Sequence, residues 1–221
     1  MHGPVVVVAG GEGLRPDVAP RVPANAHVLA ADGGVAFALA LGLRVDAVIG
    51  DLDSALPSDV EEAVASGARV ERHPPDKDET DLELALDAAL ALDPDEILVL
   101  ADDGGRLDHT LSALLLLAAP RYARCSLDAQ FGRALVHVVR DERELAGEPG
   151  EIVSLLAVEG PAEGVRTDGL AFPLAGETLQ PGSSRGVSNV FLGESARVSL
   201  EQGVLLVVRP GPEIEEREKA K

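Results

Sequence analysis

The chain has 221 residues, and 38 acidic against 19 basic side chains give it a formal net charge of −19 at pH 7. This charge argues against nucleic acid or an anionic membrane surface as a partner, because both attract basic patches, and it favours a divalent cation. One cysteine, Cys125, excludes an intrachain disulfide framework and is interpreted as a structural thiol. No basic leader and no apolar run of roughly 18 residues is present, so we expect a cytoplasmic protein without a membrane span.

Short apolar runs alternate with helical patterns over the first 132 residues. The runs predict strands at residues 5–8, 27–31, 45–49, 68–73 and 96–101, of which residues 5–8 read as a buried parallel strand. Helices are predicted at residues 35–41, 58–66, 82–92 and 110–119. Ser58 is expected to cap the second of these helices, and Thr80 with Glu83 forms a capping box for the third. The alternation predicts an α/β fold: a Rossmann-like, mostly parallel sheet with helices on both faces.

Polar turns follow the predicted strands of this sheet. They begin at Gly10, Asp32, Asp51, Asp76 and Asp102. Parallel strands end at one edge of a sheet, and ligands of open α/β sheets bind beyond that edge. The sequence therefore predicts a site there.

The most informative turn is Gly50-Asp51-Leu52-Asp53-Ser54, in which two carboxylates are one residue apart. A motif of this kind is by itself more often a plain acidic turn, but Asp78 and Asp81 follow the neighbouring strand. Oxygen ligands of this type suit Mg²⁺, which would bridge polyphosphate oxygens in phosphoryl or pyrophosphoryl transfer. Lys77 and Arg106 could contact phosphate or could form surface ion pairs.

Other chemistries are less well supported. Gly11-Glu12-Gly13 with Asp32 begins like a dinucleotide-binding fingerprint but lacks its third glycine, and there is no Walker A loop. His109 could be a general base, but a histidine beside a helix start is as often only the neighbour of a cap.

The pattern changes after about residue 134, where short β-rich segments replace the helices. They lie at residues 135–140, 152–158, 196–200 and 204–209, with frequent Gly and Pro between them, and they predict an antiparallel β-sandwich. The predicted organisation is an α/β domain at residues 1–132, a β domain at 133–212 and a charged tail at 213–221.

Five motifs occur in order along the chain: ADGG (31–34), GDLDS (50–54), DKDETDLELAL (76–86), GGRLDH (104–109) and SRGVSN (184–189). Together and in this order, they resemble the motifs of the thiamine pyrophosphokinase (thiamine diphosphokinase) family. The resemblance implies a kinase that transfers the pyrophosphoryl group of ATP to thiamine and releases AMP, with Mg²⁺ as cofactor. It also implies an ATP-binding α/β domain, a thiamine-binding β domain that takes part in dimerisation, and a homodimer with the site at the subunit interface.

The resemblance also implies roles for individual residues. The catalytic set is Asp51, Asp53, Asp78, Asp81 and Asp108, of which Asp51, Asp53 and Asp81 are the expected magnesium ligands. The substrate-binding set is Asp32, Lys77, Thr80, Arg106, Phe172, Ser188 and Asn189, with Phe172 placed against thiamine.

The chain departs from the family pattern at a few positions. Family members commonly have asparagine where this chain has Ala113, glutamate where it has Val190, and tryptophan or tyrosine where it has Phe172. Two alternatives stay open: a related pyrophosphokinase acting on a pterin alcohol, and a non-catalytic module that binds nucleotide or metal.

Overall fold

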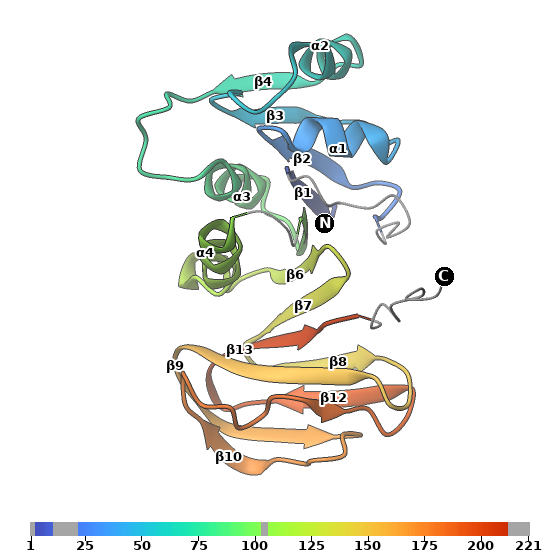
Figure 1. Ribbon diagram of the computed structural model, residues 1–221, viewed down its shortest axis with the longest axis vertical. Coiled ribbons are helices and arrows are strands. Elements are labelled where there is room, and N and C mark those ends of the chain that lie inside the picture. Colours follow the sequence, from blue (N-terminus) through green and yellow to red (C-terminus); the bar gives the residue numbers. More distant parts are fainter. Residues whose placement is uncertain (1–2, 11–21, 103–105, 212–221) are drawn as a thin grey trace, which may run out of the picture. The chain divides into compact units, whose positions relative to one another are not determined.

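The computed structural model describes residues 3–10, 22–102 and 106–211 (Figure 1). The predicted charged tail, the Gly11-Glu12-Gly13 segment and the two glycines of GGRLDH lie outside these residues. The chain divides into two units, Met1–Gly132 and Arg133–Lys221.

The first unit is built on a sheet in which all five pairs of neighbouring strands are parallel. Its strands are β1 (Val5–Ala9), β2 (His27–Ala31), β3 (Ala47–Gly50), β4 (Arg69–Arg72), β5 (Glu96–Ala101) and β6 (Ser126–Phe131), in the order β4-β3-β2-β1-β5-β6. Because the strands are parallel, the turns after β2, β3, β4 and β5 all leave the same edge, as predicted.

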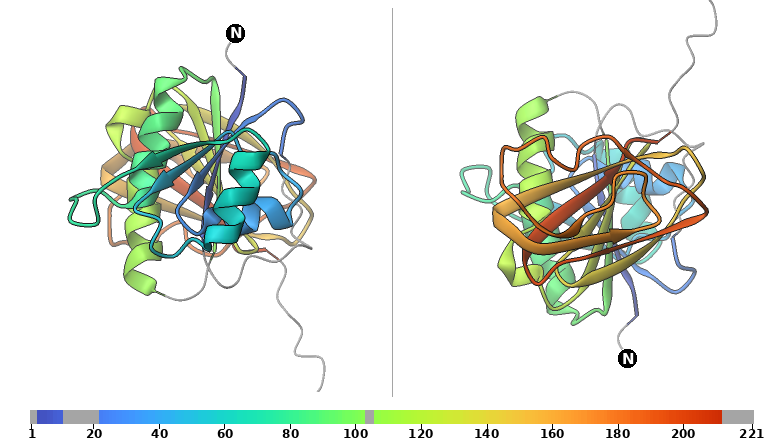
Figure 2. Two further views of the ribbon diagram at one scale, coloured as in Figure 1. Left: turned by 90° about the horizontal axis from the view of Figure 1, so that it is seen from above. Right: turned by 90° about the horizontal axis from the view of Figure 1, so that it is seen from below.

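Helices cover both faces of this sheet. They are α1 (Gly34–Ala40), α2 (Pro57–Ala65), α3 (Asp81–Ala91) and α4 (Leu107–Leu117), followed by the 3₁₀ turn η1 (Pro120–Tyr122). Val6, Val8 and Val48 pack on one face in a core that includes α1 and α2, whereas α3 contacts β1, β2 and β3. Figure 2 (left) shows α1 and α2 on the side of the sheet opposite to α3 and α4. In the described part of the chain, no helix is long and apolar enough to cross a membrane.

Three local predictions are corrected by the structure. The N-cap of α2 is Leu56, without a side-chain bond, and not Ser58, because Pro57 supplies the fixed φ that suits the first helical turn. Helix α4 begins at Leu107, three residues earlier than predicted. Strand β6 was not predicted, because its sequence SLDAQF has no clear apolar run.

The second unit consists of antiparallel strands. They are β7 (Ala134–Val139), β8 (Glu142–Ala146), β9 (Ile152–Asp168), β10 (Ala175–Leu179), β11 (Asn189–Val190), β12 (Ser195–Ser199) and β13 (Gln202–Arg209). Hydrogen-bonded neighbours follow the order β7-β13-β9-β12-β8, and β10 and β11 also pair with β9. Figure 2 (right) shows these strands from below.

The long strand β9 explains how this unit closes around a core. Glu159 and Gly160 both have positive φ and divide the strand into two parts. The part before them pairs with β13, and the part after them pairs with β10, with β12 and, at Glu163, with Gln202 of β13. Val153 and Val165, from the two halves, lie in one buried cluster. The structure thus confirms the predicted class, a mostly parallel α/β sheet followed by an antiparallel β region.

Candidate active site

The first part of the site lies where β2 and β3 end side by side. Asp32 directly follows β2, has a φ of 45°, and its backbone N–H donates to the carbonyl of Ile49 in β3 at 2.9 Å. Gly34 begins α1 so close to β1 that an added Cβ would lie 2.1 Å from the Val8 carbonyl oxygen. This close approach fixes the turn that presents Asp32.

Gly50 is the second position at which only glycine fits. Its φ is 143°, and an added Cβ would lie 2.8 Å from Oδ1 of Asp81. The glycine that leads the GDLDS turn therefore lets Asp81, at the start of α3, approach the end of β3. The sequence predicted that Asp81 follows the strand next to that of Asp51, and the structure adds this close contact with Gly50.

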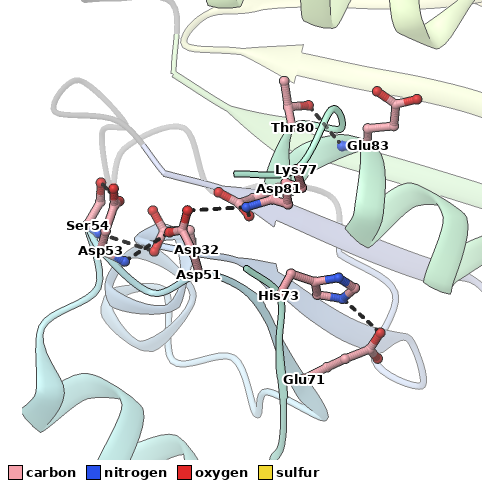
Figure 3. A network of polar contacts seen from close by, with 10 residues as sticks. All are labelled: Asp32, Asp51, Asp53, Ser54, Glu71, His73, Lys77, Thr80, Asp81 and Glu83. Carbon is pink, nitrogen blue, oxygen red and sulfur yellow. Dashed lines mark hydrogen bonds and ion pairs between the residues drawn. The ribbon is translucent and has the colours of Figure 1, made fainter. Parts of the chain in front are cut away.

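Three carboxylates meet at this edge (Figure 3). Oxygen atoms of Asp32, Asp51 and Asp53 lie within 4.8 Å of one another. The backbone N–H of Asp53 donates to Asp51 Oδ1 at 3.1 Å, and that of Ser54 donates to Asp32 Oδ1 at 3.3 Å. The hydroxyl of Ser54 donates to Asp53 Oδ1 at 2.9 Å. We refer to Asp32, Asp51 and Asp53 as the acidic cluster.

Lys77 connects the acidic cluster with Asp81. Its Nζ lies 3.2 Å from Asp51 Oδ2 and 3.0 Å from Asp81 Oδ1. Only 10% of the lysine side chain is exposed, against 13% for Asp51 and 23% for Asp81. The ammonium group therefore lies between two of the three expected magnesium ligands, while Asp32, expected only as a substrate contact, lies with Asp51 and Asp53.

The pKa values follow from these contacts. The Asp53 N–H and then Lys77 hold the pKa of Asp51 below its ordinary value. Burial, with the charge of Asp81 adding to it, raises the pKa of Asp32. Burial alone would lower the pKa of Lys77, but its hydrogen bonds to Asp81 and Asp51 raise it. The edge thus holds negative charge and already attracts one cation.

These residues fit a hard divalent ion. The cluster supplies only oxygen ligands: backbone N–H groups bind the carboxylates of Asp32 and Asp51, and the Ser54 hydroxyl binds that of Asp53. Mg²⁺ binds through one or two carboxylates completed by water and phosphate. Asp81 is not among the carboxylates that lie within 4.8 Å of one another in the described part of the chain, but it binds the same ammonium group as Asp51.

The loop before α3 holds two further expected residues. Thr80 is the N-cap of α3, as predicted, and its Oγ1 accepts from the Glu83 N–H at 3.2 Å. Asp78 is exposed, and among the described residues no hydrogen bond or ion pair joins it to Asp51, Asp53 or Asp81. The structure thus gives Thr80 a helix-capping contact and leaves Asp78 facing solvent.

Arg106 and Asp108 bind each other at the start of α4. The guanidinium donates to Asp108 at 3.2 Å through Nε and at 2.6 Å through a terminal nitrogen. Both side chains are more than 60% exposed, and Arg106 lowers the pKa of Asp108 to about 2. At neutral pH this pair is fully ionised and accessible from solvent.

In the second unit, Phe172, Ser188 and Asn189 differ sharply in exposure. Phe172 is 59% exposed, whereas Asn189 is 2% exposed. Ser188 is also exposed, has a φ of 57°, and donates its backbone N–H to the Ser154 hydroxyl at 3.1 Å. Phe172 and Ser188 can therefore reach a ligand from this surface, and the buried side chain of Asn189 cannot.

Comparisons with known proteins agree along both units. Residues 22–127 match the family model of the thiamin pyrophosphokinase catalytic domain, and residues 136–205 match that of the thiamin pyrophosphokinase vitamin B1 binding domain. Thiamine pyrophosphokinase of Bacillus subtilis (strain 168) is 26% identical over 212 residues, which cover 92% of this chain and 96% of that protein.

Solved structures give the same result. The crystal structure of the Bacillus subtilis thiamine pyrophosphokinase superposes with a TM-score of 0.84 at 25% identity, over 95% of this chain and all of the other. That of thiamin pyrophosphokinase from Geobacillus thermodenitrificans gives 0.80 at 25% identity, over 96% of this chain and 99% of the other. Two domain models matched in order, together with five motifs, confirm the resemblance: the chain belongs to the thiamin pyrophosphokinase family.

Proposed function

We propose that this enzyme is a thiamine diphosphokinase, which transfers the pyrophosphoryl group of ATP to thiamine and yields thiamine diphosphate and AMP. The observation that carries the proposal is that a catalytic-domain model and a vitamin B1 binding model match the same chain in order. The acidic cluster at the carboxyl edge of the parallel sheet supports it. We place the reaction in the cytoplasm, and the support is the single cysteine.

The acidic cluster would hold Mg²⁺ with the ATP phosphates. Bound there, the ion would supply charge neutralisation and orientation of the polyphosphate oxygens. We propose Asp51, Asp53 and Asp81 as its ligands, and we add Asp32, because its carboxylate lies within 4.8 Å of those of Asp51 and Asp53. Asp81 binds Lys77 in the metal-free protein, and we propose that this ammonium group turns toward a phosphate when the ion binds.

Positive charge near the phosphates comes from three sources. Lys77 binds Asp51 of the acidic cluster, and Arg106 is exposed at the start of α4. The N-terminus of α3, at Asp81, contributes the positive end of the helix dipole. In a loose phosphoryl-transfer transition state, positioning and charge matter more than a strong base. We therefore assign Asp108 the orientation of Arg106 or of a substrate donor, and we assign no base role to His109.

Thiamine would bind at the second unit through Phe172 and Ser188. Phe172 offers an exposed ring face to the cationic thiamine ring system. Because Phe172 is exposed and not part of its own core, Phe172→Ala is expected to raise the KM for thiamine roughly three- to tenfold, with the KM for ATP and the melting temperature nearly unchanged. Steady-state kinetics with each substrate varied in turn measures both constants.

The reaction itself is tested by a product assay. The protein is incubated with ATP, Mg²⁺ and thiamine, and AMP and thiamine diphosphate are separated by chromatography. Equal amounts of the two products support the proposal. A parallel incubation with a hydroxymethyl pterin replaces thiamine; AMP formed only there would show the pterin enzyme, and ATP binding without AMP in either would show a non-catalytic module.

We also propose that the enzyme is a homodimer with its site at the subunit interface. Light scattering should give about twice the 22.9 kDa of the chain. At limiting thiamine, mixing refolded Asp51→Asn and Phe172→Ala proteins should give more activity than the sum of the two. The reason is that a mixed dimer then contains one site with both wild-type residues. Strictly additive activity of a mixture that forms mixed dimers would place each site within one subunit.

A further inference from the structure

Phe172 lies on a short loop that is fastened along its whole length. At the base, the Thr167 N–H donates to the Leu174 carbonyl at 3.0 Å, and the Leu174 N–H donates to Thr167 Oγ1 at 2.9 Å. Further along, the Ala171 N–H donates to the Val190 carbonyl at 2.9 Å. Leu170 and Leu174, on either side of Phe172, are each 3% exposed and lie in the core of this unit.

The Asn189 side chain makes the last of these attachments, at Phe172 itself. Asn189 Oδ1 accepts from the Phe172 N–H at 2.9 Å, and Asn189 Nδ2 donates to the Phe172 carbonyl at 2.7 Å. Oδ1 also accepts from the Val190 N–H at 2.9 Å. The opposite orientation of the carboxamide would face Nδ2 toward two N–H donors and Oδ1 toward a carbonyl, so the bonding pattern fixes the orientation.

These contacts hold a large apolar side chain out of the core. Phe172 is 59% exposed, whereas two other phenylalanines, Phe131 and Phe191, are 4% and 1% exposed. Exposure of a phenylalanine is unfavourable, because the ring would gain free energy by turning inward. With both backbone polar groups of Phe172 bound to Asn189, turning inward requires these hydrogen bonds to break.

We infer that Asn189 is a positioning residue, which fixes the Phe172 backbone so that the ring stays presented to thiamine, and that its side chain does not touch the substrate. The inference rests on the proposed function for the identity of the ligand. It replaces the expectation that Asn189 binds substrate directly: the side chain is 2% exposed, and its bonding atoms already have partners within this unit.

We call the two hydrogen bonds between the Asn189 side chain and the Phe172 backbone the clamp, and the first test detects it without an activity measurement. The chain contains no tryptophan, so Phe172→Trp introduces a single indole whose fluorescence anisotropy decay reports motion at this position. Adding Asn189→Ala should increase the amplitude of fast motion. Adding Asn189→Asp, which keeps the acceptors but loses the donor to the Phe172 carbonyl, should give an intermediate amplitude. Val207→Ala, a truncation of the same core, is the matched control: it should lower the melting temperature and leave the fast motion unchanged.

The second test is a double-mutant cycle on kcat/KM for thiamine. Phe172→Ala and Asn189→Ala should each lower it by about the same factor, roughly tenfold, and the double variant should be no worse than either single variant within about twofold. The KM for ATP should stay constant in all three. Effects that multiply in the double variant would show direct contact of Asn189 with thiamine and overturn the inference.

The two tests separate the possible failures. Unchanged anisotropy in the Asn189→Ala protein overturns the clamp itself, whatever the kinetics. Increased motion combined with an unaltered thiamine KM overturns the link from Asn189 to substrate binding. If the wild-type protein forms no thiamine diphosphate, the proposed function fails, while the anisotropy still decides whether Asn189 holds Phe172.

Discussion

Lys77 connects two carboxylates that belong to different elements, Asp51 after β3 and Asp81 at the start of α3. Without metal, its ammonium group is the cation that offsets their repulsion. We predict that Lys77→Gln lowers the melting temperature of the metal-free protein and that Mg²⁺ raises it more in the variant than in the wild type, because the ion takes over this neutralisation. Thermal unfolding with and without MgCl₂ measures both effects. Lys77→Arg, which keeps the charge, is the control, and an equal Mg²⁺ response in all three proteins would contradict the prediction.

The variants Asp51→Asn and Asp53→Asn should both lose activity, but only Asp51→Asn should lower the stability of the metal-free protein. Either change to asparagine should lower turnover roughly a hundredfold or more, since each removes a proposed metal ligand. Asp51 is held in its charged form by the Asp53 N–H and Lys77, so Asp51→Asn should also lower metal-free stability. Asp53 is exposed and accepts a hydrogen bond from the Ser54 hydroxyl, so Asp53→Asn should leave the metal-free stability unchanged.

Turnover at saturating substrates and thermal unfolding in EDTA test both variants. If either variant kept nearly wild-type turnover at limiting Mg²⁺, its residue would not be a metal ligand.

The sequence predicted which residues take part in the site better than which of them lie next to one another. Asp51 and Asp53 were expected as ligands because they follow one strand two positions apart. The pairing of Asp32 with them depends on the parallel register of β2 and β3, and the insertion of Lys77 depends on a side-chain conformation, neither of which a motif encodes. Asn189 was predicted from its motif as a substrate contact. The side chain of Asn189 is buried because residues 169–172 pass beside it, and this contact between separate segments of the chain cannot be read from the motif.

At the level of elements, Tyr122 fastens η1 to α3. Its hydroxyl donates to Asp87 Oδ1 at 2.8 Å, and the Arg121 guanidinium lies 5.0 Å from the ring centroid. Burial, and then the hydrogen bond to Asp87, raise the pKa of Tyr122 well above its ordinary value of 10.0. The folded state therefore keeps the phenol protonated where the unfolded state loses the proton.

This difference gives a pH prediction with a definite sign. The stability due to Tyr122 is complete below pH 10 and falls above it, by up to about 1.4 kcal/mol per pH unit, until the folded-state pKa is reached. Tyr122→Phe should remove this part of the slope and cost about 1–2 kcal/mol at neutral pH through the lost hydrogen bond. Tyr122 is the only tyrosine, so tyrosinate absorbance should appear only on unfolding. Tyrosinate formed near pH 10 with the native circular dichroism intact would contradict this.

The elements themselves were predicted to different degrees. The central strands β1, β2 and β3 of the parallel sheet were found because they are buried and form continuous apolar runs. The exposed edge strand β4 has only one apolar residue, Val70, and β6 was missed. The antiparallel strands β8, β9 and β10 are partly exposed, and their apolar runs are short or absent. The sequence therefore did not predict β8 and β10, and it predicted β9 at less than half its length. Their existence depends on pairing with distant partners, and β9 alone pairs with β10, β11, β12 and β13.

For the whole molecule, the net charge of −19 predicts a dependence on salt that differs from the effect of a bound metal. Repulsion among excess carboxylates destabilises the folded state, and salt reduces it because the Debye length falls from about 30 Å at 0.01 M to about 8 Å at 0.15 M. The melting temperature in EDTA should therefore rise with NaCl and level off. Replacing NaCl by MgCl₂ at equal ionic strength should raise it further in the wild type, and this additional rise should be lost in Asp51→Asn/Asp53→Asn, because only a bound ion stabilises by mass action. If the melting temperature of the wild type depended on ionic strength in the same way for both salts, Mg²⁺ without nucleotide would act only by screening. If the melting temperature fell with NaCl, attraction in ion pairs such as Arg209–Glu151 would outweigh the repulsion among carboxylates.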